Sequence, residues 1–152
     1  MSSSATHRSL LDPAAQDLLL RQAYTEDRFT GEAVPGDALR AVHDLVRNGP
    51  TAFNQQPLRI HLLRSGASRR RLVRHLSPSN GEKTLAASLT ALLVVDTAFH
   101  LRLPEPCPAF AGAAALYAED PARRERSALL NGSLQAAYFL VGIRAPDSRW
   151  GR

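Results

Sequence analysis

Four polar side chains lie close together in the segment GPTAFNQQP, which spans residues 49–57: Thr51, Asn54, Gln55 and Gln56. Amide side chains donate and accept hydrogen bonds at once, so they suit a flat heteroaromatic edge that carries both C=O and N–H groups. An ordinary turn is the alternative, because Gly, Pro and Asn are common in turns. The segment therefore predicts either a turn or an edge that holds a flat polar ligand.

A second polar cluster, Asn80–Gly81–Glu82–Lys83, precedes a long apolar run. Lys83 is the only lysine of the chain. An ammonium group near a heteroaromatic edge would stabilise negative charge that collects there. Taken alone, this cluster could also be a turn. Both clusters lie at ends of apolar segments, where ligands tend to bind, and this placement favours a binding site.

The elements that must position these clusters follow from apolar periodicity and from helix caps. Asp12–Pro13 and Asp120–Pro121 each pair a capping residue with a proline suited to the first helical turn. Residues 77–81 are expected to form a turn that interrupts the regular secondary structure. The expected elements, in order, are helices over 13–23 and 37–47, a strand over 59–64, a helix over 68–76 capped by Ser68, a short helix over 82–87, a buried central strand over 89–96, a loop over 104–108 and a last helix over 121–145.

The last helix carries an apolar stripe that we expect to face the core. The members of this stripe are Leu130, Leu134, Ala137, Tyr138 and Val141. The order of elements predicts an α+β fold, with helices around a small central sheet that is antiparallel or mixed.

The bulk composition predicts one globular cytoplasmic domain. Of the 152 residues, 44% are hydrophobic and 22% are charged. No apolar run reaches the roughly 18 residues that a membrane span needs, so no membrane partner is expected. Cys107 is the lone cysteine and has no Cys or His at metal-ligand spacing, so no metal is expected.

The formal net charge of +5 raises the question of nucleic acid as a partner. Arginines cluster at residues 69–71 and 123–124, and such clusters could meet phosphates. Acidic residues lie near the second cluster, and few aromatic residues are available for base stacking. A basic nucleic-acid-binding domain therefore remains the weakest alternative, and we expect no nucleic-acid partner.

Three segments in order resemble the nitroreductase family of flavin enzymes. FTGEAVPGDALRAVHDLVRNGPTAFNQQPLRIHLLRS, residues 29–65, matches a helix, then P-[ST]-x-x-N-x-Q-P, then a strand. LSPSNGEKTLAASLTALLVVDTAFHLRLP, residues 76–104, is most similar to the malonic semialdehyde reductase (3-hydroxypropionate dehydrogenase) branch. LLNGSLQAAYFLVGIRA, residues 129–145, is similar to the long central helix of the family.

This resemblance implies an α+β homodimer that holds FMN at the subunit interface. NAD(P)H would reduce the flavin, which would then reduce a small organic substrate of the semialdehyde, nitro or enone type. The resemblance assigns no catalytic side chain. It implies cofactor contacts from a loop that reaches the flavin from the partner subunit, with Pro50, Thr51, Ala52 and Asn54. Gln56, which precedes the last proline of the motif, and the N-x-x-K pair Asn80 and Lys83 are implied as further contacts. Arg28 is implied near the phosphate.

Two departures from the family pattern lead to a second hypothesis. Tyr24 stands where the phosphate-binding segment of the family usually begins with Arg. We also expect a C-terminal truncation, with a flexible tail over 1–10, a truncated nitroreductase-like domain over 11–145 and a non-family tail over 146–152. Because one GC-rich back-translation of 145–152 gives a family-like segment in another frame, a frameshift is our hypothesis. The alternative function is a non-catalytic remnant or interaction module without productive flavin binding.

Overall fold

The computed structural model describes residues 11–25, 28–110 and 112–145. The two expected tails, 1–10 and 146–152, lie outside the described residues. In chain order the elements are α1 (Pro13–Gln16), a π-helical turn (Asp17–Arg21), α2 (Gly36–Val46), a 3₁₀ turn (Ala52–Asn54), β1 (Leu58–Leu63), α3 (Gly66–Val73), α4 (Pro78–Ala86), β2 (Thr90–Val95), a second 3₁₀ turn (Phe99–Arg102), α5 (Ala113–Ala118) and α6 (Pro121–Gly142).

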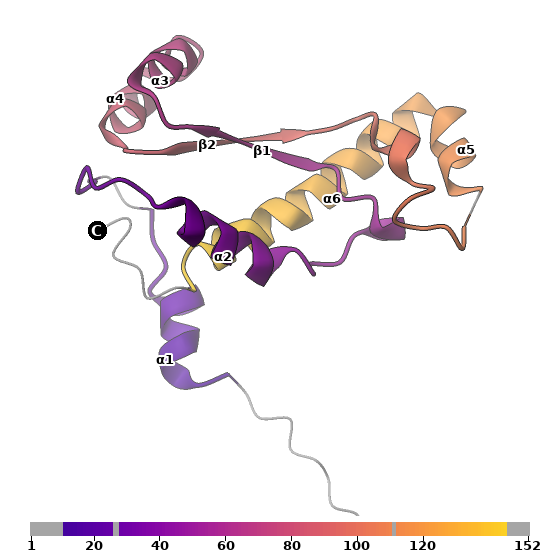
Figure 1. Cartoon of the computed structure of the whole chain (residues 1–152), viewed down its shortest axis with the longest axis horizontal. Coiled ribbons are helices and arrows are strands. Elements are labelled where there is room, and N and C mark those ends of the chain that lie inside the picture. Colours follow the sequence, from indigo (N-terminus) through magenta and orange to yellow (C-terminus); the bar gives the residue numbers. More distant parts are fainter. Residues whose placement is uncertain (1–10, 26–27, 111, 146–152) are drawn as a thin grey trace, which may run out of the picture.

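The sheet is a two-stranded antiparallel ladder, which agrees with the expected α+β fold (Figure 1). Leu58 at the start of β1 faces Val95 at the end of β2, and Leu63 faces Thr90. The prediction that β2 is a buried central strand is wrong for this chain. Because β2 has one neighbouring strand within the part of the chain that the structure describes, most of it is half-buried, and Leu92 is exposed.

Helix α6 begins as expected and supports both the sheet and α2 (Figure 1). Asp120 accepts a hydrogen bond from the backbone N–H of Arg123 at 2.9 Å, which caps the first turn. Glycines let neighbouring elements approach closely: a Cβ on Gly132 would lie 2.7 Å from Val95 Cγ2. Gly142 is likewise pressed against α2, where a Cβ would overlap Val46.

The predicted inward stripe of α6 is wrong. Leu130, Leu134, Tyr138 and Val141 are exposed, whereas Ala128, Asn131 and Gly132 are buried. The buried face is built from small residues and an amide because β2 and the segment before β1 come close to the helix there. Leu130 and Leu134 therefore remain exposed, whereas the ring of Tyr138 lies against Gly49, where an added Cβ would come within 3.0 Å of it.

Two local boundaries also differ from expectation. The cap of α3 is Ser65 and not Ser68: Ser65 Oγ accepts from the backbone N–H of Ser68 at 3.1 Å. The expected break at 77–81 is instead the first turn of α4, which begins at Pro78 after Ser77. Pro is favourable at a first helical position, and this explains the earlier start. Asn80 is thus a helical residue.

The end of the first helix and two short elements in the second half of the chain also differ from expectation. Helix α1 stops after Gln16 and continues as the π-helical turn to Arg21, short of the expected end at 23. Neither α5 nor the 3₁₀ turn at Phe99–Arg102 was expected. Alanine-rich α5 lacks the apolar periodicity that would reveal it.

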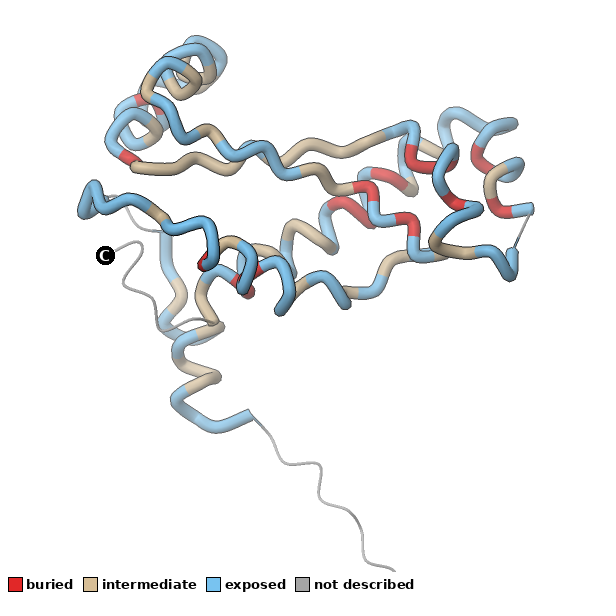
Figure 2. The backbone as a smooth tube through the Cα atoms, in the orientation of Figure 1, coloured by how far each residue is buried: buried red, intermediate tan, exposed pale blue. Residues whose placement is uncertain are grey.

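The buried core gathers at the α5 end of the molecule (Figure 2). Its members are Phe99, Leu103, Ala113, Tyr117 and Ala128, with Phe53, Val95 and Ala114 packed against them. By contrast, α1 and α3 contain no buried residue among those described. Within the described ranges, no helix is both long enough and apolar enough to cross a membrane.

Candidate functional site

The segment before β1 holds three side-chain-bearing residues in left-handed backbone conformations. Their φ angles are +51° at Phe53, +52° at Asn54 and +40° at Gln56. Such conformations cost on the order of 1–3 kcal/mol each for residues other than glycine and persist only where the surroundings hold them. Strain of this kind is concentrated at ligand-binding sites. Residues 50–56, which we call the amide loop, are therefore a candidate site.

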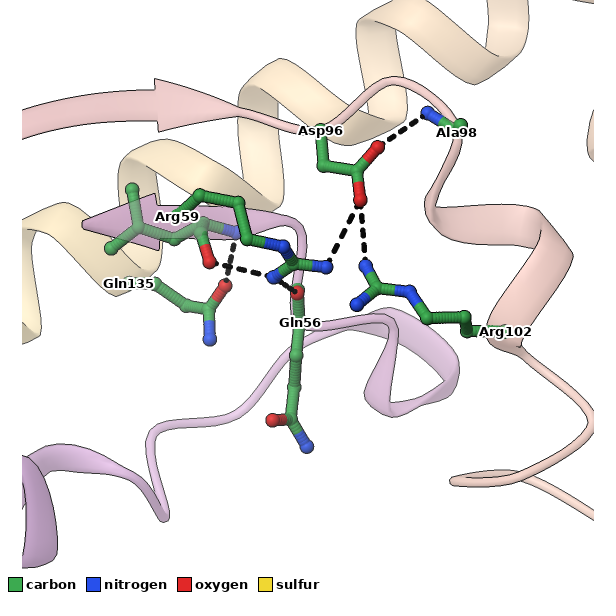
Figure 3. Close-up of polar contacts among 7 residues, drawn as sticks. Gln56, Arg59, Asp96, Ala98, Arg102 and Gln135 are labelled. Atoms are coloured by element: carbon green, nitrogen blue, oxygen red, sulfur yellow. Dashed lines mark hydrogen bonds and ion pairs between the residues drawn. The ribbon is translucent and has the colours of Figure 1, made fainter. Parts of the chain in front are cut away.

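One face of α6 holds the amide loop and the start of β1 through three polar residues, Ser127, Asn131 and Gln135. Their spacing of four residues places all three on the same side of the helix. Asn131 Oδ1 accepts from the backbone N–H of Ala52 at 2.8 Å, and Ser127 Oγ accepts from Gln55 Nε2 at 3.1 Å. Gln135 Oε1 accepts from the backbone N–H of Leu58 at 3.0 Å (Figure 3).

Gln55 and Asn131 are anchors and not ligand-facing groups, since each is only 4% exposed. Besides its bond to Ser127, Gln55 Nε2 donates to the carbonyl of Ala52 at 3.1 Å. No role was expected for Asn131, because nothing in its local sequence points to a partner 79 positions away. A repeat of polar residues every four positions, at 127, 131 and 135, runs through the apolar part of the helix and is the available signal.

Phe53 ties the amide loop to the core. Its ring centroid lies 5.3 Å from that of Phe110 and 6.3 Å from that of Tyr117. Tilted and edge-on contacts of this type add about 0.5–1.5 kcal/mol beyond the burial of area. The left-handed turn at Phe53 thus directs an aromatic ring inward while the next residue, Asn54, remains exposed.

The outer side of the amide loop presents the polar groups that the sequence predicts. Gln56 Nε2 donates to Asn54 Oδ1 at 2.7 Å, and the backbone N–H of Gln56 donates to Thr51 Oγ1 at 3.3 Å. Pro50, Thr51, Asn54 and Gln56 line one open pocket of about 500 Å³, together with His43, Arg47, Asn48 and Gly49. Ala52 is not part of that lining, and its N–H is directed to Asn131.

The other predicted cofactor contacts lie at the opposite end of the sheet. Asn80 and Lys83 are exposed on α4 (Figure 1). This helix lies in the chain between Leu63, where β1 ends, and Thr90, where β2 begins, and these two residues pair at one end of the sheet. Successive residues among the six of β1 rise by about 3.4 Å, so the strand separates that end of the sheet from the amide loop by roughly 17 Å. Within one chain, the structure therefore does not bring Asn80 and Lys83 together with the loop.

Arg28 is exposed, and the segment that follows it runs along the same end of the sheet as α4. Arg64 Nη1 donates to the carbonyl of Val34 at 2.9 Å, and Ser88 shares a small cavity of about 20 Å³ with residues 29–34. The candidate site thus has two separate parts: the amide loop, and an α4 end that carries Asn80, Lys83 and Arg28.

Solved structures show the fold. The chain matches a protein described as a candidate nitroreductase from Bacillus subtilis with a TM-score of 0.75 at 17% identity, over 87% of this chain and 71% of that one. It matches another candidate nitroreductase, from Exiguobacterium sibiricum and solved in complex with FMN, with a TM-score of 0.73 at 13% identity, over 95% of this chain and 73% of that one. These similarities establish the nitroreductase fold.

Sequence relatives show the family. A candidate NADH dehydrogenase/NAD(P)H nitroreductase of Streptomyces coelicolor is 54% identical over 137 residues, which cover 90% of this chain and 69% of the relative. A protein with the same description from Streptomyces griseus is 50% identical over 136 residues, with the same shares covered. No protein-family model matches the sequence, so the assignment rests on these relatives and on the fold. On both grounds, the chain belongs to the nitroreductase family of oxidoreductases.

Proposed function

We propose that this protein is an FMN-dependent oxidoreductase that takes hydride from NAD(P)H and reduces a small organic substrate. The observation that carries the proposal is the amide loop: a strained segment, anchored from behind by α6, that turns Thr51, Asn54 and Gln56 outward into one pocket. The description of the relatives as NAD(P)H nitroreductases and the FMN bound to one fold neighbour support the same conclusion.

The side chains of the amide loop fit a flavin ring. The pocket of about 500 Å³ lies within the range that small-molecule sites occupy. Asn54 and Gln56 offer both donors and acceptors, which matches a ring edge carrying C=O and N–H groups. When bound, FMN supplies the hydride-transfer chemistry, and the protein supplies binding, orientation and electrostatics.

The α4 end offers charges that suit the rest of the cofactor. Lys83 would lie near the pyrimidine edge of the ring, where its ammonium group stabilises negative charge and Asn80 supplies an amide contact. Arg28 would bind the phosphate, for which a planar guanidinium is well suited. Both side chains are exposed and therefore accessible to a ligand.

Because the two parts lie at opposite ends of one sheet, we propose that each FMN is held by two copies of the chain. The amide loop would come from one copy and the α4 end from the other. The apolar side chains on the outer face of α6 support a homodimer, since large exposed apolar surfaces mark interaction sites. These side chains, from 37% to 64% exposed, are Leu129, Leu130, Leu134, Leu140 and Val141.

The second substrate belongs to one of three classes: semialdehydes, nitro compounds or enones. The relatives are described as nitroreductases, and one neighbour of the same fold, with a TM-score of 0.73, is an enone reductase. Resemblance to the malonic semialdehyde reductase branch supports the semialdehyde class. Assays of the FMN-loaded protein with one compound from each class would rank the three.

An FMN titration tests the proposal and separates it from the non-catalytic alternative. Quenching of FMN fluorescence on addition of the wild-type protein is expected, with weaker binding by about tenfold for Lys83→Gln, since a hydrogen bond to a charged group contributes about 1.5–3 kcal/mol. Arg71→Gln, which removes one charge from exposed Arg71 on α3, is the matched control and should bind as wild type. A wild-type protein that leaves FMN fluorescence unchanged would instead favour the interaction module.

A further inference from the structure

Three charged residues form a cluster where the amide loop joins β1. Arg59 lies in β1, Asp96 directly follows β2, and Arg102 ends the 3₁₀ turn beyond it (Figure 3). We call these three residues the Asp96 cluster. None of them lines the pocket of the amide loop, so the cluster is a separate feature of the fold.

Arg59 links the amide loop to Asp96 with one side chain. Its Nη1 donates to the backbone carbonyl of Gln56 at 2.9 Å, and its Nη2 donates to Asp96 Oδ2 at 3.0 Å (Figure 3). The same Nη1 also donates to the carbonyl of Leu58 at 2.7 Å. Because the guanidinium is a planar, rigid fork, fixing Nη2 on Asp96 fixes the direction in which Nη1 points.

Asp96 is itself held in one orientation. Its Oδ1 accepts from the backbone N–H of Ala98 at 2.8 Å, and its Oδ2 also accepts from Arg102 Nη2 at 2.7 Å. The backbone N–H of Asp96 donates to the carbonyl of Pro57 at 2.9 Å. The carboxylate therefore cannot turn without losing several hydrogen bonds.

Burial distinguishes this cluster from ordinary surface ion pairs. The side chains of Arg59 and Asp96 are 32% and 27% exposed, whereas that of Arg102 is 49% exposed. Fully exposed pairs contribute little because water and salt screen them. The half-buried bond between Arg59 and Asp96 is screened less, and it is the one that reaches the amide loop.

We propose that Arg59 is a positioning residue for the cofactor site, because it holds Gln56 in its left-handed conformation. Asp96 orients Arg59, and Arg102 supports Asp96. Gln56 in turn bonds Asn54 and Thr51, so a change at its carbonyl moves the whole polar rim of the pocket. This inference rests on the proposed function, since it takes the rim to bind FMN.

Amide hydrogen exchange tests the positioning role without any flavin. The backbone N–H groups of Asn54, Gln55 and Gln56 all bond within the amide loop and report on its order. Arg59→Gln should speed their exchange by about tenfold, the effect of losing about 1.4 kcal/mol of local stabilisation. Arg59→Lys keeps the charge but loses the fork, so it should restore only part of the protection. Unchanged exchange in Arg59→Gln, relative to wild type and Arg71→Gln, would overturn the proposal.

An FMN titration of the same variants then tests whether the position matters for binding. Arg59→Gln and Asp96→Asn should raise the dissociation constant by about tenfold, while Arg71→Gln stays at the wild-type value. Faster exchange with unchanged FMN affinity would contradict a positioning role for the cofactor.

If either variant fails to fold, Arg102→Gln is the alternative, because it removes the most exposed residue of the Asp96 cluster. It should give the same two effects with smaller fold-changes, and their absence would overturn the proposal. If wild type itself binds no FMN, the proposed function fails, and the exchange data alone decide whether Arg59 orders the loop.

Discussion

Phe53, Asn54 and Gln56 adopt left-handed backbone conformations, which glycine adopts readily, asparagine tolerates and most other residues avoid. At about 1 kcal/mol each, the lower end of the usual range, the three together oppose folding by about 3 kcal/mol. Two hydrogen bonds to α6 hold the loop, and a third holds Leu58 beside it; each contributes about 1 kcal/mol. Each of the two contacts of the Phe53 ring adds about 0.5–1.5 kcal/mol. The loop is thus held by specific partners, each of which can be removed singly.

Asn131→Ala should lower the free energy of unfolding by about 1–2 kcal/mol, because it removes the hydrogen bond that a side chain only 4% exposed accepts from the N–H of Ala52. Urea denaturation measures this effect. Ser133→Ala, two residues further along on the exposed side of α6, is the matched control and should change stability by less than about 0.5 kcal/mol. Equal effects of the two substitutions would show that Asn131 does not anchor the loop.

Two substitutions at Asn54 should separate its backbone role from its side-chain role. Asn54→Ala introduces a residue that tolerates a positive φ poorly and should destabilise the protein by about 1 kcal/mol. Asn54→Gly keeps the conformation accessible and should cost less stability. Both remove the amide, so both should bind FMN more weakly than wild type in the fluorescence titration. An Asn54→Ala protein that is more stable than Asn54→Gly would contradict the left-handed conformation.

At the scale of elements, α6 organises the molecule through two unlike faces. Its inner face uses Gly132 and Asn131 to meet β2 and the amide loop, and its outer face carries exposed Leu130 and Leu134. Close approach without large side chains allows the helix to lie directly against β2 near Val95. The helix therefore positions the site from behind and leaves its apolar bulk free for another surface.

Gly132→Ala should destabilise the protein by about 1–3 kcal/mol, because the new methyl group would lie 2.7 Å from Val95 Cγ2 and a β-branched side chain yields little. Val95→Ala in the same chain should recover part of that loss by making room. A double-mutant cycle from urea denaturation measures the coupling. Strictly additive effects would mean that the two residues do not pack together.

The sequence allowed the elements to be predicted where local signals are strong, and failed where distant partners decide. Asp120–Pro121 marks the start of α6 through its own chemistry, and the spacing of the amide loop identifies its outward groups. The left-handed turn at Phe53 contains no glycine from which the sequence could predict it, and it exists only because residues of α6 hold it. The periodicity of the Leu130 stripe predicts a core-facing surface, and this prediction is wrong because apolar periodicity does not tell which surface will cover a helix face.

At the scale of the whole molecule, the two parts of the candidate site and the outer face of α6 lead to the same expectation. Asn80 and Lys83 lie at one end of the sheet and the amide loop at the other, so the proposed cofactor site would need two copies of the chain. A second copy that covers the exposed leucines of α6 would bury apolar surface at about 25 cal/mol per Å². Dimerisation and cofactor binding are therefore expected to be linked.

Sedimentation equilibrium should show a dimer whose dissociation constant rises by more than about tenfold in Leu130→Glu, because a carboxylate would have to be desolvated in the interface. Leu101→Glu, at a side chain that is 74% exposed and lies outside α6, is the matched control and should leave the dimer intact. Added FMN should shift the wild type further toward the dimer. A wild-type protein that remains monomeric with and without FMN would refute the two-copy site.

The most direct test of the central claim is anaerobic mixing of the FMN-loaded protein with NADH or NADPH while the flavin absorbance is followed. We predict that the absorbance bleaches with at least one of the two donors, and that Lys83→Gln, loaded with FMN at saturating concentration, bleaches more slowly because the negative charge on the reduced ring loses its partner. Bound flavin that neither donor bleaches would contradict the assignment of this chain as an NAD(P)H-dependent flavin oxidoreductase.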